Sequence, residues 1–239
     1  IYDSSASAYL TADEQVADFN ADKLSSIAGV KPASGLTQEL NIVNTRKLAN
    51  NRGTGWQQMD VLAHYAEVML MAIEYASFDS QFVIGRGVVD KIDDSSTNMS
   101  NNTGATTSLG NTSGSASGTN GLVSISYRGR ENPWGNIWIF NDGLNIEAKG
   151  IHEAYWADSG FVSDIKTTPY KNCGFTLAKA NGYISAIGHS EECDFMYIPS
   201  ETLGAENRPL NDYFYQNNAY NGFLVALLGG FWSYGSRAG

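Results

Sequence analysis

Apolar and polar positions along the chain predict helices in the first third and strands in the second half. Between residues 57 and 77, apolar side chains recur at steps of three and four, which is typical of a helix with one buried stripe. That stripe consists of Leu62, Tyr65, Ala66, Met69, Ala72, Ile73 and Ala76. A second helix is predicted over 40–51, with Gly53 where a C-terminal cap would stand, and a short third helix over 11–24.

Strand patterns follow after residue 121. Residues 122–127 alternate between apolar and polar side chains, whereas 134–140 are apolar on both faces apart from Asn136 and predict a buried central strand. Asn141-Asp142-Gly143 predicts a turn, with 144–148 as the returning strand of a hairpin. Shorter strands are predicted at 161–165, 183–187 and 195–198. Early helices and late strands in one domain indicate the α+β class.

One segment is low in sequence complexity. Residues 94–121 contain 7 Ser, 6 Thr, 5 Asn and 5 Gly among 28 positions. So few apolar side chains cannot offset the entropy lost on ordering, so the composition predicts a flexible surface loop.

Composition and charge narrow the class of partner. The 239 residues include 15 Lys and Arg against 25 Asp and Glu, a formal charge of -10. This balance argues against nucleic acid, because contacts with phosphates need a clustered excess of cations. No apolar run approaches the roughly 18 residues of a membrane span, so membrane insertion is not expected.

The residues that most often carry chemistry do not form a catalytic or metal-binding pattern. The three histidines share no ligand spacing with each other or with Cys173 and Cys193, and no Gly-x-Ser-x-Gly element occurs. Asp60, His64 and Glu67 have ligand-like spacing, but a solvated helix face is the favoured interpretation. We therefore expect no enzyme activity, no cofactor and no metal site.

The two cysteines leave two alternatives open. Cys173 and Cys193 are 20 positions apart and would pair as a disulfide in an oxidising compartment. Two separate buried thiols are the favoured alternative, because two cysteines do not make a disulfide framework.

The last 31 residues, 209–239, have an unusual composition. They hold 8 aromatic side chains together with Asn, Ser and Gly, and only a single residue of each charge, Asp212 and Arg237. Antibody binding loops use the same mixture, because tyrosine gives large rigid contacts and small polar residues adapt their hydrogen bonds. Phe223 to Leu228 is apolar enough for a core strand, so binding is expected of the polar and aromatic segments on either side.

Several motifs, spread over about residues 27–239, resemble one protein family. They are R-K-L-A-N-N-R-G-T-G-W at 46–56, I-E-Y at 73–75, the segment 80–87, E-N-P-W-G-N-I-W at 131–138 and F-N-D-G at 140–143. They resemble phage and prophage proteins with a C-type lectin fold of the formylglycine-generating-enzyme-like subtype, whose hallmark is Gly-Asn-[Val/Ile]-Trp. The ending L-L-G-G-F-W-S-Y-G-S-R-A-G resembles the variable region of proteins diversified by retroelements.

The resemblance implies a fold and a domain organisation. The fold would be a C-type-lectin-like domain with two helices packed on a mixed, mainly antiparallel sheet and with long loops. Residues 1–35 would lead into a domain at 36–239, and 209–239 would be a variable binding region that continues beyond Gly239. Trp138, Gly229, Gly230, Trp232 and Gly235 would be the scaffold of that region, with Trp138 buried as a core anchor.

The resemblance also implies a function in recognition. The protein would be a receptor-binding protein or adhesin at a phage tail tip or on a bacterial cell surface. Its partners would be a host cell-surface protein or glycan, other virion proteins and further copies of itself, for example in a trimer. The binding residues would be Tyr213, Tyr215, Asn217, Asn218, Tyr220, Asn221, Phe231, Ser233, Tyr234 and Arg237.

Two other functions remain open at this point. The first is a structural virion protein that decorates a tail or capsid without binding a receptor. The second is an enzyme of the formylglycine-generating type, but that branch needs cysteines after its Gly-Gly element and residues 233–239 contain none. Calcium-dependent sugar binding needs a Glu-Pro-Asn or Gln-Pro-Asp element, whereas this chain has Glu131-Asn132-Pro133.

Overall fold

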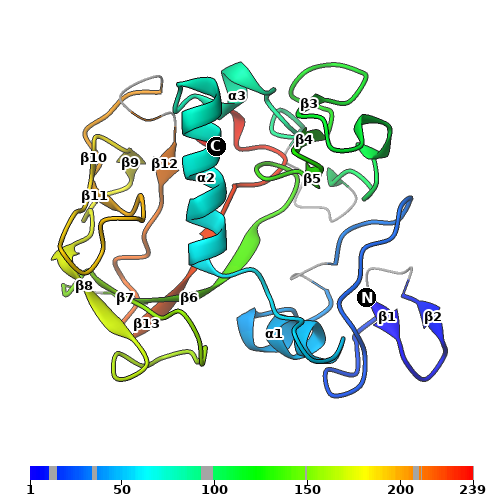
Figure 1. The fold of residues 1–239 in the computed structure, drawn as a ribbon, viewed down its shortest axis with the longest axis horizontal. Coiled ribbons are helices and arrows are strands. Elements are labelled where there is room, and N and C mark those ends of the chain that lie inside the picture. Colours follow the sequence, from blue (N-terminus) through cyan, green and yellow to red (C-terminus); the bar gives the residue numbers. More distant parts are fainter. Residues whose placement is uncertain are drawn as a thin grey trace. The chain divides into compact units, whose positions relative to one another are not determined.

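The described chain divides into two compact units. The computed structural model describes residues 1–10, 15–33, 37–92, 99–148, 150–206, 210 and 212–238. Unit 1 comprises Ile1–Gln58, Ile84–Trp138 and Gly229–Gly235, and unit 2 comprises Met59–Val83, Ile139–Leu228 and Ser236–Gly239. Few helices and several antiparallel sheets occur in these residues, which confirms the α+β class (Figure 1).

Unit 1 contains short elements. Strands β1 (Tyr2–Asp3) and β2 (Ala8–Tyr9) form a hairpin, and β3 (Gly114–Ser115), β4 (Ile125–Tyr127) and β5 (Arg130–Glu131) form a three-stranded antiparallel sheet in that order. Helix α1 (Ile42–Asn50) confirms the helix predicted at 40–51. It begins where the Asn41 side chain accepts a hydrogen bond from the Asn44 backbone N–H, the usual N-cap arrangement.

The predicted helix at 11–24 is wrong for its described part. Residues 11–14 lie outside the described residues, and 15–24 contain no helix. Lys23 forms an antiparallel bridge with Tyr2, and the Asp22 carboxylate accepts backbone hydrogen bonds from Ser4 and Asp18. Contacts with a distant strand therefore replace the local hydrogen bonds that a helix needs.

The Ser/Thr/Asn/Gly-rich segment is more organised than its composition predicts. Residues 94–98 lie outside the described residues, whereas 99–121 contain a 3-10 helix, η2 (Thr107–Leu109), and strand β3. The Glu131 carboxylate accepts hydrogen bonds from the backbone N–H groups of Gly104 and Thr106 at 2.8 and 2.7 Å. A distant carboxylate therefore satisfies backbone donors of this part, which the composition of the segment does not indicate.

Unit 2 is built on a four-stranded antiparallel sheet. Its order is β13 (Phe223–Leu228), β6 (Ile139–Glu147), β7 (Glu153–Trp156) and β8 (Lys171–Thr176) (Figure 1). Two smaller sheets pair β9 (Gly182–Tyr183) with β12 (Tyr213–Phe214), and β10 (Ala186–Ile187) with β11 (Pro199–Glu201). The predicted strands at 161–165 and 195–198 are wrong, and 183–187 is divided between β9 and β10.

The predicted hairpin at 141–148 is a bulge inside one strand. Strand β6 runs from Ile139 to Glu147, and on its β13 side Phe140 pairs with Leu227 while Asn145 pairs with Val225. Asn141 and Asp142 lie within this irregularity and are buried. The turn-forming residues therefore interrupt the ladder without reversing the chain.

The buried tryptophan near the start of β6 is not the predicted one. Trp134 is 1% exposed, and its indole N–H donates to the Arg86 carbonyl at 3.2 Å. Trp138 is only half-buried. Residues 134–138 are irregular backbone rather than strand, so alternation along them does not decide which side chains face inward.

Helix α2 (Val61–Tyr75) confirms the strongest predicted helix, but its buried stripe differs from the prediction. Within α2 only Val61 and Tyr65 are buried, and Ile73 is 72% exposed. The second half of the helix is apolar on most sides, so its sequence pattern does not define one inner face. The short helix α3 (Ser80–Val83) follows α2.

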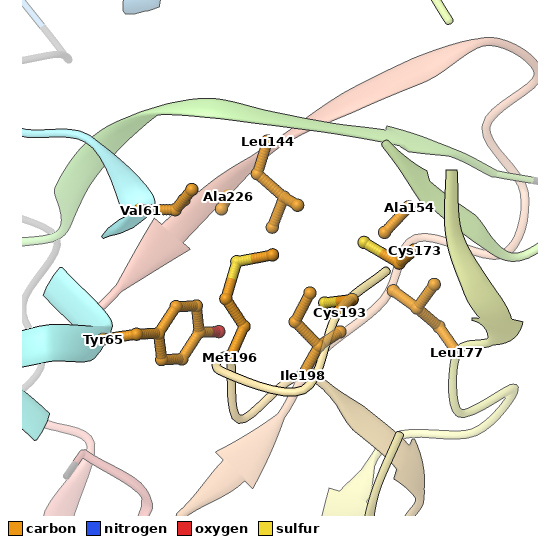
Figure 2. Packing of buried hydrophobic residues seen from close by; sticks show 10 residues of the cluster. All are labelled: Val61, Tyr65, Leu144, Ala154, Cys173, Leu177, Cys193, Met196, Ile198 and Ala226. Carbon is orange, nitrogen blue, oxygen red and sulfur yellow. The ribbon is translucent and has the colours of Figure 1, made fainter. Parts of the chain in front are cut away.

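The largest core cluster of unit 2 lies between α2 and the sheet. Figure 2 shows the Tyr65 ring of α2 pointing toward Met196, with Leu144 of β6 and Ile198 nearby. Cys173 and Cys193 belong to the same cluster as free, fully buried thiols. Of the two alternatives left open by the sequence, the structure has the unbonded thiols.

Candidate ligand-binding site

The ten predicted binding residues divide between the two units. Unit 2 holds Tyr213, Tyr215, Asn217, Asn218, Tyr220, Asn221 and Arg237. Unit 1 holds Phe231, Ser233 and Tyr234.

Strand pairing brings three tyrosines of unit 2 together. Tyr213 of β12 is the register partner of Tyr183 in β9, and their rings meet edge to face with centroids 5.0 Å apart. The Tyr215 ring lies 4.6 Å from the Tyr213 ring in a tilted arrangement. Such aromatic pairs are worth about 0.5–1.5 kcal/mol beyond the area that they bury, so the three rings hold one another in place.

Arg237 completes this group. Its Nη1 donates a hydrogen bond to the Tyr215 hydroxyl oxygen at 2.9 Å, and its guanidinium carbon lies 5.2 Å from the centroid of the Tyr213 ring. The hydrogen bond with Tyr215 is the main cause of a raised pKa for Arg237. We call Tyr183, Tyr213, Tyr215 and Arg237 the tyrosine–arginine cluster. It presents aromatic rings, phenolic hydroxyls and a permanent positive charge in one place.

The segment after β12 is attached to the unit at alternate positions. The Gln216 backbone N–H donates to the Asn181 side-chain oxygen at 2.7 Å, and the Asn218 side chain donates to the Lys179 carbonyl at 2.8 Å. Gln216 is buried, whereas Tyr215, Asn217, Asn218, Tyr220 and Asn221 are exposed. Exposed polar and aromatic side chains therefore stand on an anchored backbone.

A buried histidine, His152, contacts the buried Gln216 side chain. His152 Nε2 accepts a hydrogen bond from the Gly150 backbone N–H at 3.3 Å, and His152 Nδ1 contacts the Gln216 side-chain amide. The atom of Gln216 that meets His152 Nδ1 is the amide nitrogen Nε2, so the buried imidazole and the Gln216 amide hold each other in place.

A carboxyl group with a raised pKa stands directly before the cluster. Asp212 is half-buried, and burial raises its pKa to about 7, although a hydrogen bond from the Tyr213 backbone N–H acts in the opposite direction. Burial, and then the Asp212 charge, also raise the pKa of the Tyr65 hydroxyl. Asp212 therefore changes its charge near neutral pH, next to the cluster.

Two of the three predicted residues of unit 1, Phe231 and Tyr234, pack against Trp138. The Phe231 ring stacks on Trp138 with centroids 5.9 Å apart, and the Tyr234 ring meets Trp138 edge to face at 4.9 Å. Phe231 and Tyr234 are themselves 4.4 Å apart, and both, like Ser233, are half-buried. Much of their ring surface is thus used inside unit 1, and only part of it remains open to a ligand.

Backbone hydrogen bonds hold the segment that carries these rings. Gly135 N–H donates to the Gly229 carbonyl at 2.7 Å, and Lys91 N–H donates to the Trp232 carbonyl at 2.8 Å. Gly135 has a φ of +71°, and a Cβ atom there would lie 2.8 Å from the Val88 carbonyl oxygen. Only glycine fits such a position, which gives the Gly135-Asn136 motif a structural role.

Some residues of the unit 2 group were not predicted from the sequence. Tyr183 joins the cluster through strand pairing, and its hydroxyl is 2.9 Å from the Ser236 hydroxyl. His152 and Asn181 hold Gln216 from positions 64 and 35 residues away. No local pattern marks these partners, because each contact joins distant parts of the chain.

The proposed metal-like spacing on α2 has another explanation. The Asp60 carboxylate caps α2 by accepting the Ala63 backbone N–H at 2.9 Å. In the parts of the chain that the structure describes, no group of three or more His, Cys, Asp and Glu side chains is placed to hold a metal ion.

The helices of the chain and its comparison with known proteins also bear on the class of protein. Among the described residues, no helix combines the length and the apolar character that crossing a bilayer requires. No protein-family model, no curated protein and no solved structure matches this chain. The evidence on function therefore comes from the predicted binding residues of unit 2 and of unit 1.

Proposed function

We propose that this chain is a ligand-binding protein that recognises a receptor on a host cell. Its binding surface comprises the tyrosine–arginine cluster and the exposed side chains of 215–221. The observation that carries the proposal is the exposure of Tyr215 and Tyr220, 39% and 46%, on a backbone that Gln216 and Asn218 anchor.

The chemistry of these side chains suits recognition. Tyrosine contributes a large rigid contact with only two side-chain torsions to fix, so binding costs little conformational entropy. The ring contacts among Tyr183, Tyr213 and Tyr215 order the surface before a ligand arrives, which lowers that cost further. Asn217 and Asn221 supply adaptable hydrogen bonds at the rim.

The family resemblance supports a location for this activity. It favours a phage tail tip or a bacterial cell surface, with other virion proteins and further copies of the chain as partners. Phe231, Ser233 and Tyr234 are proposed to contribute to binding through the surface that their own packing leaves open. The receptor is proposed to be a cell-surface protein or glycan.

Binding of fluorescently labelled protein to a panel of intact bacterial strains tests the proposal. We expect the double variant Tyr215→Ala, Tyr220→Ser to bind at least tenfold more weakly than the wild type, because aromatic anchors dominate such interfaces. Its thermal midpoint should stay within about 3 °C, since exposed substitutions usually change stability by about 0.5 kcal/mol.

A matched control separates site effects from surface effects. Tyr9, which is 40% exposed in β2, offers a similar ring that is not among the residues of the proposed surface, and Tyr9→Ala should bind like the wild type. Equal binding by the double variant and the wild type would contradict the proposal. Incorporation into virions without binding to any strain would favour a structural virion protein instead.

A further inference from the structure

We propose that the tyrosine–arginine cluster binds a sugar residue that bears a carboxylate, with Arg237 as the residue that pairs with that group. This inference rests on the proposed function and specifies the chemistry of its ligand.

Arg237 is an exposed cation that no carboxylate of the described residues neutralises. Its guanidinium is exposed, and its partners among the described residues are phenol groups and an aromatic ring rather than a carboxylate. Two other cations pair with carboxylates instead, Arg86 with Asp90 at 2.7 Å and Lys166 with Glu147 at 3.0 Å. In a chain with 25 acidic and 15 basic residues, a cation without an acidic partner is available to an external anion.

The guanidinium of Arg237 keeps hydrogen-bond donors that can serve a ligand. Arginine has five N–H donors in a rigid fork, and among the described residues only the Tyr215 hydroxyl accepts from them, through Nη1. That hydrogen bond and the nearby Tyr213 ring fix the fork before binding. The remaining donors match the two oxygens of a carboxylate, which arginine binds through two parallel hydrogen bonds.

The surroundings of Arg237 favour a sugar acid over an acidic protein. A run of Asp and Glu residues needs several cations, and the net charge of -10 would repel such a partner. A single carboxylate on an otherwise neutral ring needs only one cation. The Tyr215 ring and the paired hydroxyls of Tyr183 and Ser236, 2.9 Å apart, then supply apolar contact and hydrogen bonds for the rest of the sugar.

Saturation-transfer NMR on the full chain tests the inference with matched probes. The probes are methyl glucuronide, N-acetylneuraminic acid and the methyl ester of each, which keeps the ring but removes the charge. We expect the wild type to bind at least one acid, with at least tenfold weaker binding of its ester and a strong loss of binding in high salt.

Two substitutions of one residue sharpen the test. Arg237→Gln removes the charge and should weaken acid binding at least tenfold, whereas Arg237→Lys keeps the charge without the fork and should give an intermediate loss. Both should keep the wild-type thermal midpoint within about 3 °C, because Arg237 is exposed. A variant that binds the acids like the wild type would overturn the inference, as would equal binding of acid and ester.

Further outcomes separate this inference from the proposed function. Failure to bind any of the acids, or preferential binding of a poly-glutamate peptide, would overturn the sugar-acid inference. If Arg237→Gln binds host cells normally while Tyr215→Ala, Tyr220→Ser does not, the receptor-binding function stands and the carboxylate inference fails. If the wild type binds no cells at all, the proposed receptor-binding function fails.

Discussion

The Tyr215 hydroxyl accepts a hydrogen bond from Arg237 Nη1 at 2.9 Å, although the two residues are 22 positions apart. A second contact supports the same end of the chain, since the buried Gln81 side chain donates to the Ala238 carbonyl. The segment 236–238 therefore belongs structurally to unit 2 and supplies it with its exposed guanidinium.

Trp134 should be a main source of stability in unit 1. Trp134→Ala removes a ring that is almost completely buried, and we expect the free energy of unfolding to fall by about 3–5 kcal/mol. Urea denaturation followed by circular dichroism measures this loss. Trp56, which is 54% exposed, is the control, and Trp56→Ala should cost about 1 kcal/mol or less. Similar losses in both variants would contradict this assignment.

Glu131 should hold the Ser/Thr/Asn/Gly-rich segment in place. Its carboxylate accepts the N–H groups of Gly104 and Thr106 and the Thr106 hydroxyl. Glu131→Gln keeps the shape but removes the charge, and we expect a loss of about 1.5–3 kcal/mol together with faster amide exchange at 104–106. Hydrogen exchange with mass spectrometry measures the effect, and the exposed Glu191→Gln serves as the control. Unchanged exchange would show that the carboxylate does not order the segment.

Asp212 should make the protein less stable as pH rises. Its folded pKa of about 7 lies above the unfolded value near 3.8, so the folded state binds more protons between these two values. Stability is then highest below about pH 4 for this group and falls through pH 7 by an amount on the order of 4 kcal/mol. Asp212→Asn should flatten this slope in urea denaturation from pH 4.5 to 7.5, whereas the exposed Asp158→Asn should not. A rise of wild-type stability attributable to Asp212 over this range would refute the assignment.

Cys173 and Cys193 should be unreactive in the folded protein. Both thiols are fully buried, and the hydrogen bond between them raises the pKa of Cys173 and lowers that of Cys193. Without access to solvent, neither presents a thiolate to a reagent. Intact-mass analysis after iodoacetamide treatment should find no modification under native conditions and two modified thiols in 6 M guanidinium. Rapid native labelling of either cysteine would show that this core opens.

The sequence predicts features that depend on neighbouring residues and misses those that depend on distant ones. Helix α1 follows from its local pattern and the Asn41 cap, and Tyr213 and Tyr215 stand out by the composition of residues 209–239 alone. Tyr183 and His152 could not be assigned to the site, because β9–β12 pairing and the Gln216 contact join remote segments. The inward face of α2 was misjudged since Ile73 and its neighbours are apolar on a largely exposed surface.

The low-complexity segment shows the same limit from another side. Composition measures how much apolar area a segment can bury, and by that measure 99–121 should not be ordered. It does not register that Glu131 supplies acceptors for Gly104 and Thr106, or that Ser115 pairs with Ile125 in a sheet. Order imposed by partners outside a segment cannot be found within that segment.

The alternation at 215–217 has a consequence for how the protein can evolve. The buried Gln216 side chain contacts His152 and its backbone N–H donates to Asn181, while the side chains of Tyr215 and Asn217 are exposed. The residue that fixes this short segment and the residues that it exposes are therefore different ones. Under the proposed function, substitutions at the outward positions would change receptor specificity while Gln216 keeps the backbone in place, so host range would change without a change of fold.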